Sequence, residues 1–131
     1  MLNRRDFIRG AATSVGAMTV LSSETVKAAA DSTMSLNVIY PNKEGAKFDA
    51  AYYRSSHIPL AMKVMKADKV ILIEGVPMGT NPAPYAMIAH FQFASAAALQ
   101  AGLADPGMAG VRADVAKFTD IQPTVMLGKT V

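Results

Sequence analysis

The sequence predicts an α+β domain whose strands and helices follow the order β-α-β-β-α-β. Four short runs rich in β-branched and aromatic residues are separated by two stretches whose apolar residues recur at helical spacing. The two middle runs are joined by a loop too rich in proline for a helix. This order is that of the ferredoxin-like fold, in which four antiparallel strands carry two helices on one face.

The first strand and the first helix are expected in the segment that follows residue 35. Residues 36–40 form a β-prone run that Pro41 closes. Helical spacing begins at Ala46 and predicts a helix that breaks at Pro59, because a proline pushes the preceding residue out of the helical region. Residues 60–65 are consistent with one further turn.

The second half of the chain repeats this pattern. Residues 69–76 predict the second strand, residues 77–84 hold three prolines and predict a loop, and residues 85–93 alternate as a third strand. Ser95 is a good N-cap for the second helix, and Asp105 followed by Pro106 predicts a renewed helical start. Residues 122–128 predict the fourth strand.

The predicted sheet has more apolar side chains than one layer of helices covers. They are Val38, Tyr40, Ile71, Ile73, Met87 and Phe91. Because a contiguous exposed apolar face usually marks an interface, we expect a homodimer in which the two sheets face each other.

The first thirty residues have the organisation of an export signal. Arg4, Arg5 and Arg9 precede a weakly apolar stretch over residues 11–21, and Ala28-Ala29-Ala30 offers a cleavage site of small residues. The adjacent arginines, with Phe7 two places after them, resemble the twin-arginine signature. We therefore expect residues 1–30 to be a twin-arginine-type signal and residues 31–131 to be the domain.

This leader predicts contact with the twin-arginine translocase and a periplasmic or otherwise exported protein after cleavage near Ala30. Two alternatives stay open: an amphipathic first helix of the domain, and a translation start at Met34. Without the leader the chain carries nine basic and eight acidic residues, a net charge of +1, so no nucleic-acid partner is expected. The apolar runs are too short for stable membrane insertion.

Residues 48–60, FDAAYYRSSHIPL, resemble a segment of the EthD family, in particular the Tyr52-Tyr53 pair and His57-Ile58-Pro59-Leu60. The resemblance extends over residues 35–131 and implies the dimeric α+β barrel fold. The namesake of the family is linked to breakdown of a branched alkyl ether beside an oxidase, and some relatives resemble cofactor-independent lyases that act on aromatic molecules. No glycine-rich dinucleotide fingerprint supports a reductase.

His57 is the main candidate for chemistry, because imidazole moves protons near neutral pH. Tyr52 and Tyr53 are its candidate catalytic neighbours, and either of them or Asp49 is expected to orient the ring. The alternative is that His57 caps the C-terminus of the first helix.

Four further residues are candidates for contact with a ligand in the cavity of the barrel. They are Tyr40, Tyr85, His90 and Gln92, which lie on predicted strands. Packing is the alternative role for each of them.

No metal site or cofactor is expected. The chain has two histidines, no cysteine and no His-x-x-His spacing. Haem needs only one axial histidine and stays open as an alternative.

Three functions remain open for a protein with this sequence. The first is a small cofactor-free enzyme acting on an apolar or aromatic small molecule, with His57 as acid and base. The second is a periplasmic carrier that binds such a molecule without turnover, and the third is a structural dimer without a ligand.

Overall fold

The computed structural model describes residues 33–131, and the signal predicted over residues 1–30 lies outside this part of the chain. Its element order confirms the predicted β-α-β-β-α-β pattern. The strands are β1 (Met34–Pro41), β2 (Lys69–Glu74), β3 (Tyr85–Phe93) and β4 (Thr124–Lys129). The helices are α2 (Ala50–Tyr52), α3 (Ile58–Met65), α4 (Ala96–Ala104) and α5 (Met108–Asp114).

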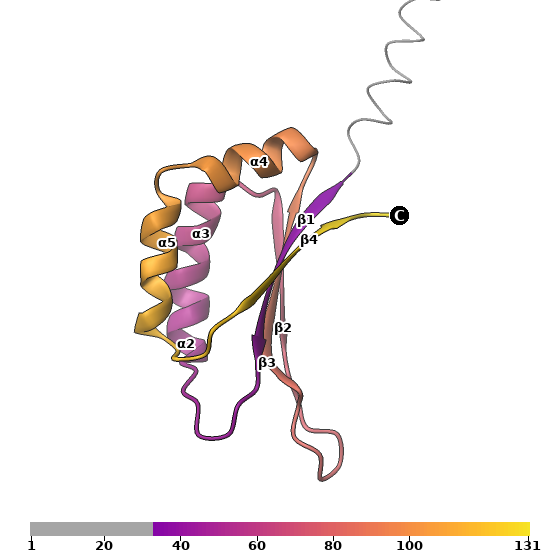
Figure 1. Cartoon of the computed structure of the whole chain (residues 1–131), viewed down its shortest axis with the longest axis vertical. Helices are drawn as coiled ribbons and strands as arrows, with labels where there is room; N and C mark the ends of the chain where they lie inside the picture. Colours follow the sequence, from indigo (N-terminus) through magenta and orange to yellow (C-terminus); the bar gives the residue numbers. More distant parts are fainter. Residues whose placement is uncertain (1–32) are drawn as a thin grey trace, which may run out of the picture. The chain divides into compact units, whose positions relative to one another are not determined.

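The four strands form one antiparallel sheet in the order β2-β3-β1-β4. The helices all lie against one face of this sheet, and the loop between β2 and β3 extends beyond its lower end (Figure 1). This is the ferredoxin-like arrangement that the sequence predicts. Within residues 33–131 no helix is both long enough and apolar enough to cross a membrane.

The predicted break of the first helix at Pro59 is wrong. A π-helical turn, η1 (Tyr53–His57), joins α2 to α3, so the helix is continuous from Ala50 to Met65. The amide of Ile58 donates to the carbonyl of Tyr53, five residues earlier. Because a π turn is wider than an α turn, it gives room for the proline ring, which would otherwise clash with the carbonyl four residues before it.

The helix start signals are confirmed in part. Asp49 is the N-cap of α2, and Ser95 caps α4 by accepting from the amide of Ala98 at 3.1 Å. Asp105 accepts from the amide of Gly107 at 2.7 Å and closes a turn, so α5 begins at Met108, two residues later than predicted. A short 3₁₀ segment, η2 (Val115–Lys117), ends this helical stretch.

The two faces of the sheet differ in their burial. On the covered face, Tyr40, Met87 and Phe91 are each no more than 3% exposed, and they form the core with the helices. The open face carries Ile71 and Ile73, which are 38% and 52% exposed. The six apolar strand residues were expected to form one uncovered surface, and this expectation is wrong. Side chains alternate between the two faces along each strand, so Ile71 and Ile73 lie on the open face and the others on the covered face.

Candidate functional site

The π turn brings two aromatic rings together on the inner side of the first helix. Tyr53 and His57 are both buried, and their rings stack with centroids 5.5 Å apart. Phe118 lies against both rings, with its centroid 4.5 Å from that of His57. Extra residues in a π turn change which side chains face inward, and such turns are frequent at functional sites.

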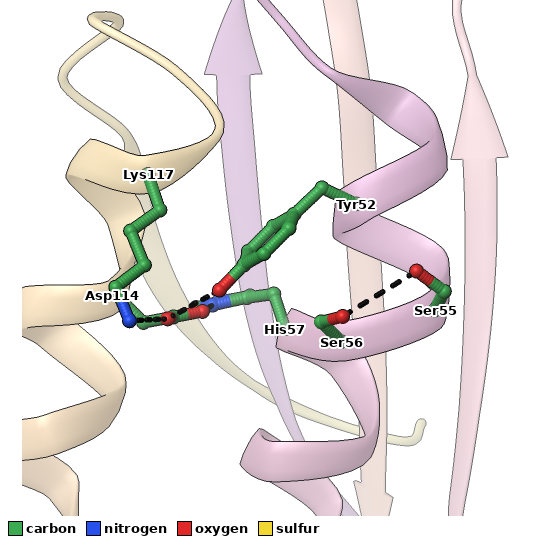
Figure 2. A network of polar contacts seen from close by, with 6 residues as sticks. All are labelled: Tyr52, Ser55, Ser56, His57, Asp114 and Lys117. Atoms are coloured by element: carbon green, nitrogen blue, oxygen red, sulfur yellow. Dashed lines mark hydrogen bonds and ion pairs between the residues drawn. The ribbon is translucent and has the colours of Figure 1, made fainter.

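Asp114, at the end of α5, is buried and is the centre of a hydrogen-bond network that runs from the core to the surface. Its Oδ2 lies 2.9 Å from Nδ1 of His57, and its Oδ1 accepts from the hydroxyl of Tyr52 at 2.8 Å. Lys117 reaches Oδ1 at 3.5 Å from the solvent side. Figure 2 shows the three side chains meeting at this carboxylate from two helical segments.

The network keeps Asp114 ionised. Burial of the carboxyl acts to raise its pKa, but hydrogen bonds from His57, Tyr52 and Lys117, together with the positive charge of His57 when it is protonated, outweigh burial, so the pKa is lowered. The hydrogen bond between Tyr52 and Asp114 raises the pKa of Tyr52, because the neutral hydroxyl is the donor in this bond. An ionised carboxylate only accepts, so Nδ1 of His57 carries the proton in this bond.

An apolar cavity of about 190 Å³ lies between the covered face of the sheet and the helices. His57 and Tyr53 line it from the first helix, Tyr40 from β1 and Arg112 from α5, and the remaining lining is almost entirely aliphatic and aromatic. Nδ1 of His57 is held by Asp114, and Nε2 makes no hydrogen bond within residues 33–131. Nε2 is therefore the ring nitrogen available to a molecule in the cavity.

The two tyrosines in the cavity stay protonated near neutral pH. Burial raises the pKa of Tyr40 to about 12, although the neighbouring Tyr53 hydroxyl acts in the opposite direction. Burial, with Tyr40 as the second cause, raises the pKa of Tyr53 as well. Both phenols are thus hydrogen-bond donors, and the basic atom of the cavity is on His57.

The structure brings some of the candidate residues together and separates others. His57, Tyr53 and Tyr40 line the cavity, and Tyr52 reaches it indirectly through Asp114. Tyr85 is 45% exposed near the start of β3, next to the loop between β2 and β3. His90 and Gln92 lie on the open face of the sheet, so these three residues are outside the cavity that holds His57.

His90 belongs to a separate polar cluster on the open face, the Asn37 cluster, formed with Ser35 and Asn37 of β1. The amide nitrogen of Asn37 donates to Ser35 Oγ at 3.0 Å and to the carbonyl of Met126 at 3.2 Å. These bonds leave its amide oxygen to accept from Nδ1 of His90 at 2.6 Å. Both histidines of the chain are thus held through Nδ1, but by different acceptors.

Sequence reasoning missed Asp114, which takes the orienting role expected of Tyr52, Tyr53 or Asp49. Asp49 is instead the N-cap that accepts from the amide of Tyr52 at 3.0 Å. The capping alternative for His57 is wrong, because the helix continues for eight residues beyond it. The available signal for Asp114 was its position three residues after Val111, which puts a carboxylate on the apolar side of α5.

The described part of the chain contains no group of three or more histidine, cysteine, aspartate or glutamate side chains placed to hold a metal ion. The fold and the site together define a ferredoxin-like α+β domain with a buried histidine–carboxylate pair beside an apolar cavity.

Comparison with known proteins gives the family. The model of the EthD domain matches residues 43–122, and the chain belongs to this family. An EthD-like protein from Ralstonia eutropha JMP134 is 27% identical, with a TM-score of 0.71 over 77% of this chain and 94% of that one. An ethyl tert-butyl ether D family protein from Bacillus halodurans C-125 is 17% identical, with a TM-score of 0.61 over 76% and 99% of the two chains.

No curated protein matches this chain. The family model gives the family and the EthD-like structures give the fold, and neither identifies a reaction.

Proposed function

We propose that the protein is a small enzyme that works without a bound cofactor on an apolar or aromatic molecule held in the cavity. The observation that carries this proposal is the position and hydrogen bonding of the His57 ring. Its Nδ1 is fixed by the carboxylate of Asp114 at 2.9 Å, and its ring lines the cavity. A fixed ring with one nitrogen open to a bound molecule is the arrangement that general acid–base catalysis needs.

The residues have separate roles in such a reaction. Nε2 of His57 removes a proton from the bound molecule, and the resulting imidazolium is stabilised by Asp114, which keeps its own negative charge. Tyr40 is a protonated donor that can hydrogen-bond a substrate oxygen as negative charge develops on it, and Tyr53 supports Tyr40 by hydrogen-bonding its oxygen. The proton then returns from Nε2 to another atom of the substrate or to a leaving group, which restores His57.

Tyr52 is a positioning residue in this scheme. Its hydroxyl binds Asp114 and is absent from the lining of the cavity. Replacement of Tyr52 by phenylalanine is therefore expected to affect turnover only through the orientation of Asp114 and His57.

The test begins with native mass spectrometry of protein purified from its own host, as wild type and as His57→Ala. A small molecule bound to the wild type and lost from the variant supports the cavity as its site. The isolated molecule is then incubated with the wild type, with His57→Gln and with the control His90→Gln, and products are followed by mass spectrometry. Conversion by the wild type and by His90→Gln, but not by His57→Gln, supports an enzyme. Binding without conversion supports a carrier.

We also propose that the protein is a homodimer that covers the open face of the sheet. Ile71, Ile73 and Met126 are each at least 38% exposed there, and the polar groups of Asn37 are already satisfied within one copy. A second copy can therefore cover this face without leaving that amide unpaired. Sedimentation is expected to give a dimer for the wild type and a monomer for Ile73→Glu. The control Val76→Glu changes an exposed valine of the β2–β3 loop and is expected to stay dimeric.

Export is a third proposal, and it rests on the sequence of the leader. Arg4 and Arg5 resemble the twin-arginine signature, and lysine at both positions is expected to retain the precursor inside the cell. Fractionation of cells that express the wild type and the double variant tests this. Release of the mature protein from both would favour another export route, and retention of both inside the cell would favour the start at Met34.

A further inference from the structure

Arg112 stands apart from the rest of the cavity lining. It is the one lining residue with a permanent charge, and its side chain is exposed near the C-terminal end of α5. A second groove, of about 520 Å³, shares Arg112, Val115, Pro123 and Val125 with the inner cavity and is open to solvent. Arg112 therefore lies where the inner cavity meets the outer groove.

The guanidinium of Arg112 has no ion-pair partner within residues 33–131. The acidic groups near it are occupied: Asp114 binds His57 and Tyr52, and Asp120, which lines the outer groove, accepts from the amide of Lys47 at 3.0 Å. The other arginine of the domain, Arg54, is paired with Glu74 at 3.3 Å. Arg54 thus has a carboxylate partner within the described residues, and Arg112 has none there.

We propose that the site takes an apolar or aromatic molecule that carries a carboxylate, with the carboxylate bound by Arg112 and the apolar part beside His57. A guanidinium offers a planar pair of donors that matches a carboxylate, and the apolar lining accepts the remainder of such a molecule. Arg112 then determines specificity and orients the substrate, while His57 meets the reacting atom. This inference rests on the proposed function and narrows the class of its substrate.

Exposure to solvent limits the affinity that the pair between Arg112 and a carboxylate can add. Because Arg112 is exposed, the pair with a carboxylate is screened, and a gain of about twofold to fivefold in affinity is expected. The gain should fall as salt is added, whereas the affinity of an uncharged molecule should be nearly independent of salt.

The test compares 4-butylbenzoate with 4-butylbenzamide, which has the same shape without the charge. Binding to the full mature protein is measured by titration calorimetry at low and high salt, and by shifts of the His57 ring signals in NMR. We expect the acid to bind about twofold to fivefold more tightly than the amide, and Arg112→Gln to remove this preference without weakening binding of the amide. Arg112→Lys should retain part of the preference, and the control Arg54→Gln should retain all of it.

Three results would overturn the inference while leaving the proposed function intact. The first is equal affinity of the wild type for acid and amide, and the second is a preference that survives in Arg112→Gln. Tighter binding of the amide would point to Asp120 as the dominant charge of the groove and would also overturn it. If neither probe binds, the carboxylate inference fails, and the ligand carried by the native protein then decides the proposed function by itself.

Discussion

The two faces of the sheet hold the two histidines of the chain in similar bonds but in different surroundings. On the covered face, His57 is 5% exposed and bonded to the carboxylate of Asp114 at 2.9 Å, beside an apolar cavity. On the open face, His90 is half-buried and bonded to the neutral amide oxygen of Asn37 at 2.6 Å. The hydrogen-bond partner and the neighbouring cavity, and not the histidine itself, therefore decide which ring is equipped for acid–base catalysis.

The carboxylate matters because it stabilises a charge that the amide cannot. When His57 takes a proton, the product is an imidazolium next to a fixed negative charge. When His90 takes one, its acceptor stays neutral, and the bond gains far less. The Asn37 cluster is better suited to fixing the geometry of the sheet surface than to proton transfer.

The largest expected effect is the loss of turnover in His57→Gln. Glutamine can keep a hydrogen bond to Asp114 but has no basic nitrogen, so turnover of the native ligand should fall by about 10²–10⁴-fold. Steady-state product formation measures the loss. The matched variant His90→Gln should leave turnover unchanged, and an equal loss in both would remove the distinction between the two faces.

The next effect in size is the loss of stability in Phe118→Ala. Phe118 is 3% exposed and packs against Tyr53 and His57, so its truncation should cost about 3–5 kcal/mol in urea unfolding. Ile73 on the open face is 52% exposed, and Ile73→Ala should cost less than about 1 kcal/mol at protein concentrations that give a monomer. A comparable cost at Ile73 under those conditions would mean that the open face is buried within one copy.

The sequence predicted the sheet more fully than the site, for physical reasons. β3 was predicted with the observed bounds, because the residues of 85–93 that face the helices alternate in the sequence with those that face the open side. Pro59 misled the helix prediction, because a proline usually ends a helix, whereas here the π turn over Tyr53–His57 gives room for the proline ring. Asp114 was missed because its partner lies 57 positions away, a distance that only the packing of α5 against α3 brings within hydrogen-bond range.

A smaller effect is expected in the acid range for Asp114→Asn. The pKa of Asp114 is lowered in the fold, so its ionised form stabilises the protein above the pKa of the unfolded chain, and this contribution is lost as the pH falls through the folded pKa. Removal of the charged acceptor should cost about 1–3 kcal/mol at neutral pH and make the acid limb of the stability curve less steep. Urea unfolding between pH 2 and pH 7 measures both.

The control for this pH dependence is Asp68→Asn, which changes an exposed carboxylate. Its stability curve should follow that of the wild type at every pH. A curve for Asp114→Asn that remained as steep as that of the wild type would show that another carboxylate controls acid unfolding.

The smallest expected effect is that of Lys117→Gln, at the solvent edge of the covered-face network. Lys117 is 67% exposed in its side chain and lies 3.5 Å from Asp114, so solvent screens the pair, and its loss should change stability by less than about 0.5 kcal/mol. The hydrogen bonds from His57 and Tyr52 to Asp114 remain, and turnover should therefore be kept. Urea unfolding and product formation check both expectations. A large loss of turnover in Lys117→Gln would show that the surface charge of Lys117, and not the hydrogen bonds from His57 and Tyr52 to Asp114, maintains the activity of His57.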